Sequence, residues 1–140
     1  MAEQTLYKEV LLDHFHHPRN KSDLTESDVV RRGSNPRCGD EIEVGIEVEA
    51  GRLSRVRFRG RGCSVCIASA SMMTEAVTGC DAAEARALAD SMRGWFAGDA
   101  TETVEPAPSL GPLSAVRAYP ARRRCVLLSW EALTDAIEAL

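Results

Sequence analysis

Hydrophobic and acidic residues alternate over residues 41–49, and this period of two predicts a strand with one buried face. A turn at Ala50-Gly51 separates this strand from residues 55–61, where hydrophobic residues alternate with arginines. The pattern predicts a β-hairpin with glutamates on the outer face of one strand and arginines on that of the other. Such cross-strand ion pairs contribute roughly 0.2–1 kcal/mol each and disfavour a slipped register. Leu53 interrupts the alternation and predicts a bulge near the turn.

Helical spacing of hydrophobic residues dominates the rest of the chain. It predicts a first helix over residues 5–16, which Pro18 ends, followed by a polar loop with a short turn over residues 20–33. Beyond the hairpin, helices are expected over residues 68–77, from a capping box at Asp81 and Glu84, over 113–119 and from Arg122 onward, with a surface loop over 98–112. The side chains expected to face inward on the capped helix and the last helix are Ala87, Leu88, Met92, Trp95, Phe96, Cys125, Leu128, Leu133, Ala136, Ile137 and Leu140.

A run of strands followed by a run of helices is typical of the α+β class. We therefore expect a small antiparallel β-sheet of three strands with helices packed on one face. At 140 residues the chain is long enough for a substantial core, and we expect residues 1–140 to form a single domain.

Composition and charge exclude several classes of protein. The formal net charge of −4 argues against a nucleic-acid-binding surface. The arginine row of the hairpin is not evidence for one either, because glutamates of the neighbouring strand face it. The apolar runs are too short to span a bilayer, and the first residues lack the features of a secretory signal. We therefore expect a cytoplasmic protein, in which the five cysteines serve as ligands, reactive thiols or core residues rather than disulfides.

The segment Ser-Asn-Pro-Arg-Cys-Gly-Asp at residues 34–40 carries the most distinctive chemistry. Pro36 excludes a helix, and Gly39 permits a tight turn between Cys38 and Asp40. A thiolate and a carboxylate two residues apart suit zinc or iron. The alternative interpretation of the same segment is a turn whose cysteine is incidental. The other candidate cysteines are Cys63, Cys66, Cys80 and Cys125. His14, His16 and His17 share one short stretch and are interpreted mainly as packing or surface residues.

Two of these cysteines are placed favourably for a metal. Cys63 ends the hairpin beside Gly62, and Cys125 begins the last helix after three arginines, where a thiolate is favoured electrostatically. The resulting candidate site has three sulfurs and one exchangeable oxygen and consists of Cys38, Asp40, Cys63 and Cys125.

Cys63 and Cys66 also form a CxxC motif, for which other functions exist. A thioredoxin-like redox pair would likewise follow a strand and open a helix, but its βαβ context is absent from the predicted elements. A zinc deaminase would need a His-x-Glu motif and a proline before the first cysteine, which this sequence lacks. Cys66 is therefore interpreted as a small core residue and Cys80 as incidental.

Three cysteine motifs in this order resemble the U-type iron–sulfur cluster assembly proteins. They are Asn-Pro-Arg-Cys-Gly-Asp at 35–40, Gly-Arg-Gly-Cys-Ser-Val-Cys at 60–66 and Arg-Arg-Arg-Cys-Val-Leu-Leu-Ser-Trp at 122–130. Residues 6–20, which end in His-Pro-Arg-Asn, resemble the family's first helix. The IscU branch has a histidine where this chain has Arg124, and the SufU branch carries an insertion where this chain has residues 92–111. The chain therefore resembles the SufU branch.

The resemblance implies a function. It places the metal ligands at Cys38, Asp40, Cys63 and Cys125, with Zn²⁺ as the resident ion and Cys38 as acceptor of persulfide sulfur. The sulfur donor would be a pyridoxal-phosphate (PLP)-dependent cysteine desulfurase of the SufS type, to which this protein would be a zinc-dependent sulfurtransferase partner rather than a stand-alone enzyme. The alternative is a scaffold on which an Fe–S cluster is built and handed to apo iron–sulfur proteins or other Suf components. A structural zinc domain that binds protein partners is a third hypothesis, which the carboxylate ligand and the Pro/Gly loop disfavour.

Overall fold

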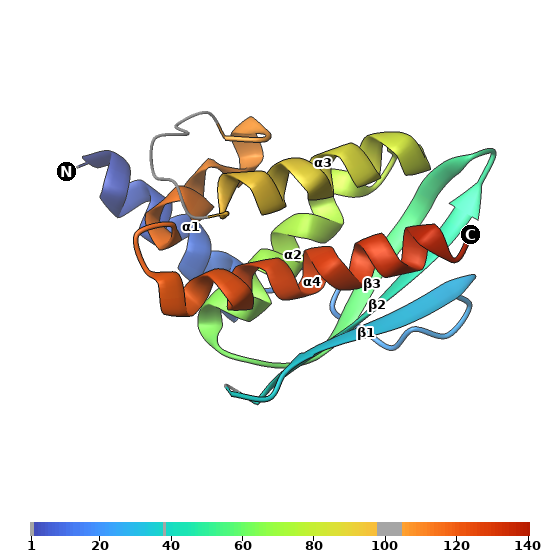
Figure 1. Cartoon of the computed structure of the whole chain (residues 1–140), viewed down its shortest axis with the longest axis horizontal. Coiled ribbons are helices and arrows are strands. Elements are labelled where there is room, and N and C mark those ends of the chain that lie inside the picture. The colour runs from blue at the N-terminus through green and yellow to red at the C-terminus, as the bar shows by residue number, and fades with distance from the viewer. Residues whose placement is uncertain (1, 38, 98–104) are drawn as a thin grey trace.

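The computed structural model describes residues 2–37, 39–97 and 105–140. Its elements, in chain order, are α1 (Ala2–His16), β1 (Val29–Asn35), β2 (Asp40–Glu49), β3 (Arg52–Arg61), α2 (Ser64–Val77), α3 (Ala82–Trp95), the 3₁₀ helix η1 (Pro108–Val116) and α4 (Pro120–Glu138). Figure 1 shows the three strands forming one sheet with the helices stacked on one side of it. The predicted α+β class and the helix-covered, three-stranded antiparallel sheet are confirmed.

The predicted hairpin forms between β2 and β3, which pair antiparallel with Val44 opposite Phe58. The register shifts between Glu47 and Val48, and the shift pairs Val48 with Leu53, which confirms the expected bulge. The outer face carries the predicted ion pairs: Arg59 Nε lies 3.0 Å from Glu43 Oε1, and Arg55 Nε lies 3.9 Å from Glu47 Oε2. These pairs are exposed, so they contribute mainly to the register.

Residues 29–33 form a strand, so the loop expected over residues 20–33 is wrong there. β1 pairs antiparallel along β2, from Val29 opposite Ile46 to Asn35 opposite Asp40. The segment lacks clear alternation because it is an edge strand whose side chains are mostly exposed or half-buried. Its conformation is determined by tertiary contacts: a Cβ at Gly33 would lie only 3.1 Å from the Leu128 side chain of α4.

The outer face of the sheet is less solvated than its charge pattern suggests. The loop before β1 covers part of it, so that Arg57 is only 6% exposed. Its guanidinium donates to the Thr25 carbonyl and, at 3.2 Å, to Glu47. A Cβ at Gly45 would collide with Ser27, which explains why a glycine occupies the middle of β2.

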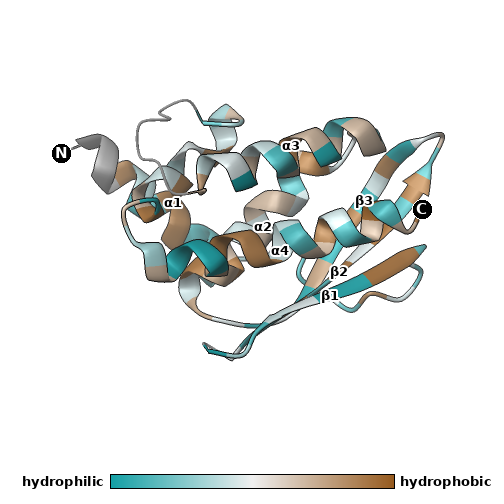
Figure 2. Ribbon diagram, viewed as in Figure 1, coloured by the Kyte–Doolittle hydropathy of each residue, from teal (hydrophilic) through white to brown (hydrophobic). Residues whose placement is uncertain are grey.

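Two helices lie directly on the inner face of the sheet: α4 contacts β1 and β2, and α2 contacts β3. α1, α3 and η1 pack against these two helices from the outside. In Figure 2, hydrophilic and hydrophobic segments alternate along α4, whose inward face includes Leu128, Trp130 and Leu133. No helix within the described part of the chain is long and apolar enough to cross a membrane.

The predicted helices differ from the observed ones in their bounds and in two core positions. α2 begins at Ser64, earlier than expected. The 3₁₀ helix η1 replaces the expected helix at 113–119 and also the end of the loop expected over 98–112. Residues 98–104 of that expected loop lie outside the described residues. The capping box of Asp81 and Glu84 is confirmed. Ala87 is exposed whereas Ala85 and Ala89 are buried, because the inner stripe of α3 is displaced from the expected one. Leu140 is 54% exposed, since it follows the end of α4.

A buried hydrogen-bond network ties the end of α1 to α2. The Ser71 hydroxyl hydrogen-bonds His14 Nδ1 at 2.7 Å and accepts the Arg19 backbone N–H at 2.8 Å. Burial lowers the pKa of His14, and the nearby Arg19 adds to this effect, while Glu75 and Asp13 oppose it. His14 is thus a packed, neutral residue, whereas His16 and His17 are exposed. This agrees with the interpretation of the histidines as packing and surface residues.

The lowered pKa of His14 makes stability pH-dependent. Because the pKa of His14 in the folded state lies below its ordinary value of about 6.5, the unfolded chain takes up the proton first as the pH falls. We expect the free energy of unfolding to decrease as the pH drops below about 6.5. Urea denaturation at several pH values should show a flatter pH dependence for His14→Gln than for the unmodified protein. His16→Gln, at an exposed site, should match the unmodified protein. Equal pH dependence in all three proteins would contradict this role of His14.

Candidate metal site

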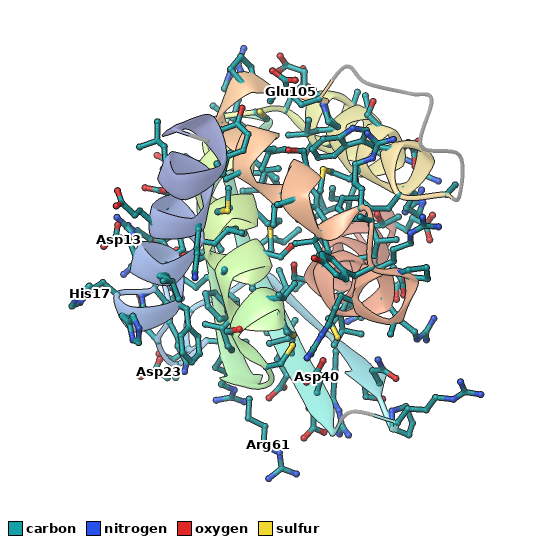
Figure 3. The ribbon with its side chains drawn as sticks, turned by 90° about the vertical axis from the view of Figure 1, so that its left-hand side faces the viewer. Asp13, His17, Asp23, Asp40, Arg61 and Glu105 are labelled. Carbon is teal, nitrogen blue, oxygen red and sulfur yellow. The ribbon has the colours of Figure 1, made fainter. Side chains whose placement is uncertain are left out.

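Asp40, Cys63 and Cys125 come together at one end of the sheet, where their ligand atoms all lie within 4.8 Å of one another. Asp40 is the first residue of β2, Cys63 is the N-cap residue of α2, and Cys125 lies in the second turn of α4. Figure 3 places Asp40 below the turns of α2, with Arg61 extending away from the protein at the same end. Three of the four predicted ligands therefore converge from three separate elements. The fourth, Cys38, lies outside the described residues.

Strand pairing fixes Asp40 at this end. Asn35 and Asp40 are partners in the β1–β2 register, so the last pair of this ladder places Asp40 at this end of the sheet. Gly39 has a φ of +70°, which confirms that the turn uses the backbone freedom of glycine. The Asp40 side chain is only 2% exposed. A carboxylate this well buried needs compensating partners.

Cys63 supplies one such partner through its backbone. Its N–H donates to Asp40 Oδ1 at 3.1 Å, and its Sγ lies 4.0 Å from Asp40 Oδ2. Two glycines, one near the end of β3 and one just after it, allow the Cys63 backbone to come this close to Asp40. Gly60 has a φ of +137°, and a Cβ there would lie 2.0 Å from the Glu41 carbonyl oxygen. A Cβ at Gly62 would lie 3.1 Å from Asp40 Oδ1, so glycine 62 leaves room for the carboxylate.

Cys125 is fully buried, and its protonation differs from the sequence-based expectation. The start of α4 and the preceding arginines were expected to favour the thiolate. Burial instead raises the pKa of the Cys125 thiol, and the adjacent Asp40 and Cys63 raise it further. In the absence of a bound metal ion, Cys125 is therefore a neutral thiol at pH 7, and a metal ion would have to displace its proton.

Arg122 is the cation that belongs to this group. Electrostatic attraction to Cys63, and then to Cys125 in its thiolate form, raises the pKa of Arg122, because its exposed guanidinium lies beside both sulfurs. The run of three arginines predicted a positive environment in general. Sequence reasoning did not single out Arg122, although its position three residues before Cys125 places it one helical turn away.

The donor chemistry fits a metal of the zinc or iron type. Two sulfurs and one carboxylate oxygen form a mixed soft and hard set that such ions accept. Cys66 and Cys80 are not part of the metal-ligand group found among the described residues. Cys66 is fully buried in the core, as expected, and Cys80 follows α2 with its Sγ 3.7 Å from the Ala76 carbonyl oxygen.

Comparison with known proteins gives consistent matches over most of the chain. Residues 6–125 match the family described as NifU-like N terminal domain. The chain is 36% identical to the zinc-dependent sulfurtransferase SufU of Bacillus subtilis over 133 residues, which cover 95% of this chain and 90% of that protein. It is 34% identical to the iron–sulfur cluster assembly scaffold protein IscU of Streptococcus pyogenes, covering 95% of this chain and 83% of that protein.

Solved structures share the fold as well. The N-terminal part of a nitrogen-fixing NifU-like protein from Brucella abortus superposes with a TM-score of 0.81 at 25% sequence identity. The match covers 99% of this chain and 96% of the Brucella chain.

Proposed function

Because the chain belongs to the NifU-like N-terminal domain family, we propose that it works in iron–sulfur cluster assembly by accepting persulfide sulfur from a cysteine desulfurase. The observation that carries this proposal is the convergence of Asp40, Cys63 and Cys125 within 4.8 Å. With Cys38 as the fourth member, this group would be the Cys₃Asp site of a SufU-type protein, and residues 1–140 would act as one domain. The name of the Bacillus relative, a zinc-dependent sulfurtransferase, supports the same assignment.

Zn²⁺ would be held by Cys38, Asp40, Cys63 and Cys125, where it would keep the thiolates deprotonated without redox chemistry of its own. Asp40 and Arg122 have separate roles in the proposed site. Asp40 anchors the backbone of Cys63 and offers the one hard ligand of the set. Arg122 balances the negative charge of Cys63 and Cys125.

Cys38 would be the sulfur acceptor because of its neighbours. Pro36, Arg37 and Gly39, which flank Cys38 in the sequence, are all exposed, and an acceptor between them would be accessible to a partner protein. In the transfer, the Cys38 thiolate attacks the terminal sulfur of the persulfide on the desulfurase. A new S–S bond forms on Cys38, the S–S bond on the desulfurase breaks, and the desulfurase cysteine leaves as a thiolate.

The partner would be a PLP-dependent cysteine desulfurase of the SufS type, and the recipients would be other Suf components or apo iron–sulfur proteins. We place the reaction in the cytoplasm, where reducing conditions keep five cysteines as thiols. Within this system the protein would be a sulfurtransferase partner rather than a stand-alone enzyme.

A scaffold role is the second candidate, with the Fe–S cluster as cargo. The ligand set suits iron as well as zinc, and the Streptococcus relative is named a scaffold protein. A purely structural zinc domain is disfavoured, since such sites are usually closed by Cys and His rather than by a carboxylate.

Sulfur uptake provides the direct test. The protein is mixed with a SufS-type desulfurase and cysteine, alanine release is followed, and persulfide is located by mass spectrometry. We expect persulfide on Cys38, its loss in Cys38→Ser, and unchanged uptake in Cys80→Ser. Metal analysis and the visible spectrum separate the two candidates, because one zinc in a colourless protein favours transfer and a brown protein favours the scaffold. Uptake that persists in Cys38→Ser would contradict the proposed acceptor.

A further inference from the structure

The Cys-Ser-Val-Cys motif at residues 63–66 contains one cysteine, Cys66, that has no role in the proposed sulfur transfer. β3 ends at Arg61, Cys63 is the N-cap residue of α2, and Cys66 is the third residue of that helix. A CxxC pair that follows a strand and opens a helix has the local arrangement of thioredoxin-like redox motifs. The surrounding fold is not thioredoxin-like, so the chemistry of the pair depends on its local geometry alone.

The two cysteines differ in exposure in the way that a redox pair requires. Cys63 is half-buried, and its sulfur lies in the metal-ligand group with Asp40 and Cys125. Cys66 is 0% exposed. A Cβ at Gly62 would lie 2.9 Å from Cys66 Sγ and 3.1 Å from Asp40 Oδ1, so the Cys66 sulfur and the Asp40 carboxylate border the same glycine. An oxidant from solvent therefore reaches Cys63 first, with a second thiol behind it.

We propose that Cys63 and Cys66 form a reversible disulfide when the site meets a peroxide. The Cys63 thiolate attacks one peroxide oxygen, the O–O bond breaks, and Cys63 becomes a sulfenic acid while hydroxide leaves. The Cys66 thiol then attacks the Cys63 sulfur, the S–O bond breaks, and the departing hydroxide takes the thiol proton and leaves as water, while the first hydroxide is protonated by solvent. The peroxide is reduced to water, and the two thiols are oxidised to one disulfide.

The local geometry permits this bond. Cys63 is the N-cap residue and Cys66 the N3 residue of α2, and an N-cap side chain is directed toward the N3 residue, as in a capping box. A disulfide needs Cβ atoms about 3.5–4.5 Å apart, so forming it requires only an adjustment of this first turn. Cys63 makes no side-chain capping hydrogen bond to α2, so turning its Sγ toward Cys66 breaks no cap.

The disulfide would change the metal site because it withdraws Cys63 from the ligands, and reduction by a thiol would restore it. This consequence rests on the proposed metal-binding role of Cys63. The formation of the disulfide does not, so the two can be tested separately.

The first experiment uses the metal-free full-length protein and hydrogen peroxide. Digestion with trypsin without reduction yields a peptide of residues 62–86, which contains Cys63, Cys66 and Cys80. We expect fragmentation to place the disulfide between Cys63 and Cys66, in the unmodified protein and equally in Cys80→Ser. A disulfide from Cys63 to Cys80 or to Cys125, or a Cys66 that remains a thiol, overturns the proposal.

The second experiment uses the zinc-loaded protein, peroxide and a chromogenic chelator that reports released zinc. Cys66→Ser and Cys66→Ala should each release zinc about tenfold more slowly than the unmodified protein, because the intramolecular second step is lost. Cys80→Ser should release it at the unmodified rate. Equal release in the Cys66 variants overturns the link between the disulfide and the metal. A protein that binds no zinc contradicts the proposed function instead, and the first experiment still decides the thiol pair.

Discussion

Replacing Cys125 by serine is expected to raise the dissociation constant for zinc by at least about a hundredfold. Cys125 is fully buried and shares its site with Asp40 and Cys63, so its sulfur lies on the side of the site that solvent does not reach. A serine hydroxyl stays protonated at neutral pH and is a poor zinc ligand. Structural zinc sites gain about 10–16 kcal/mol from four ligands, so losing one thiolate accounts for a factor of this size.

The measurement is competition for zinc between the protein and a chelator of known affinity. Cys80→Ser is the matched control, since it removes a half-buried thiol outside the metal-ligand group and should leave the affinity unchanged. Urea denaturation of the metal-free variants separates lost affinity from lost folding. If Cys125→Ser binds zinc as tightly as the control while remaining folded, Cys125 is not a ligand.

The parts of the fold that the sequence predicted are those encoded by local periodicity. The β2–β3 hairpin follows from alternation and from the pairing of glutamates with arginines, both visible in adjacent segments. The capping box at Asp81 is likewise complete within four residues. By contrast, residues 29–33 have no marked period, and they form a strand because β2 and Leu128 supply the contacts. Long-range contacts of this kind leave no periodic signal in the segment itself.

The candidate site shows the same division. Residue chemistry and the family resemblance predicted that Asp40, Cys63 and Cys125 converge, and the structure brings these three together. The raised pKa of Cys125 was not predicted although its inward position was, because the extent of its burial and the nearness of Asp40 and Cys63 depend on the whole fold. The place of Arg122 beside both sulfurs also required the docking of α4 next to the start of α2. Cys38 remains a predicted ligand.

Asp40 should separate zinc binding from sulfur uptake. Three thiolates hold zinc tightly, and the carboxylate is the weakest and most exchangeable member of the proposed set. Asp40→Ala should therefore still bind zinc. It should take up sulfur on Cys38 about tenfold more slowly, since the one readily exchangeable ligand is gone and opening the site then requires release of a thiolate.

Cys63 N–H donates a hydrogen bond to Asp40 Oδ1 at 3.1 Å, so Asp40→Asn tests the role of the charge more specifically than Asp40→Ala does. Asp40→Asn keeps an oxygen to accept that bond and removes the negative charge, so the connection into α2 stays in place. We expect both variants to slow sulfur uptake, and Asp40→Asn to match the unmodified protein in unfolding by urea. Alanine release and persulfide on Cys38, measured with a desulfurase and cysteine, give the uptake rates. Uptake that is normal in Asp40→Asn but slow in Asp40→Ala would assign Asp40 a purely structural role. Normal zinc content and normal uptake in both variants would make Asp40 a bystander, and the proposed exchange of the carboxylate would fail.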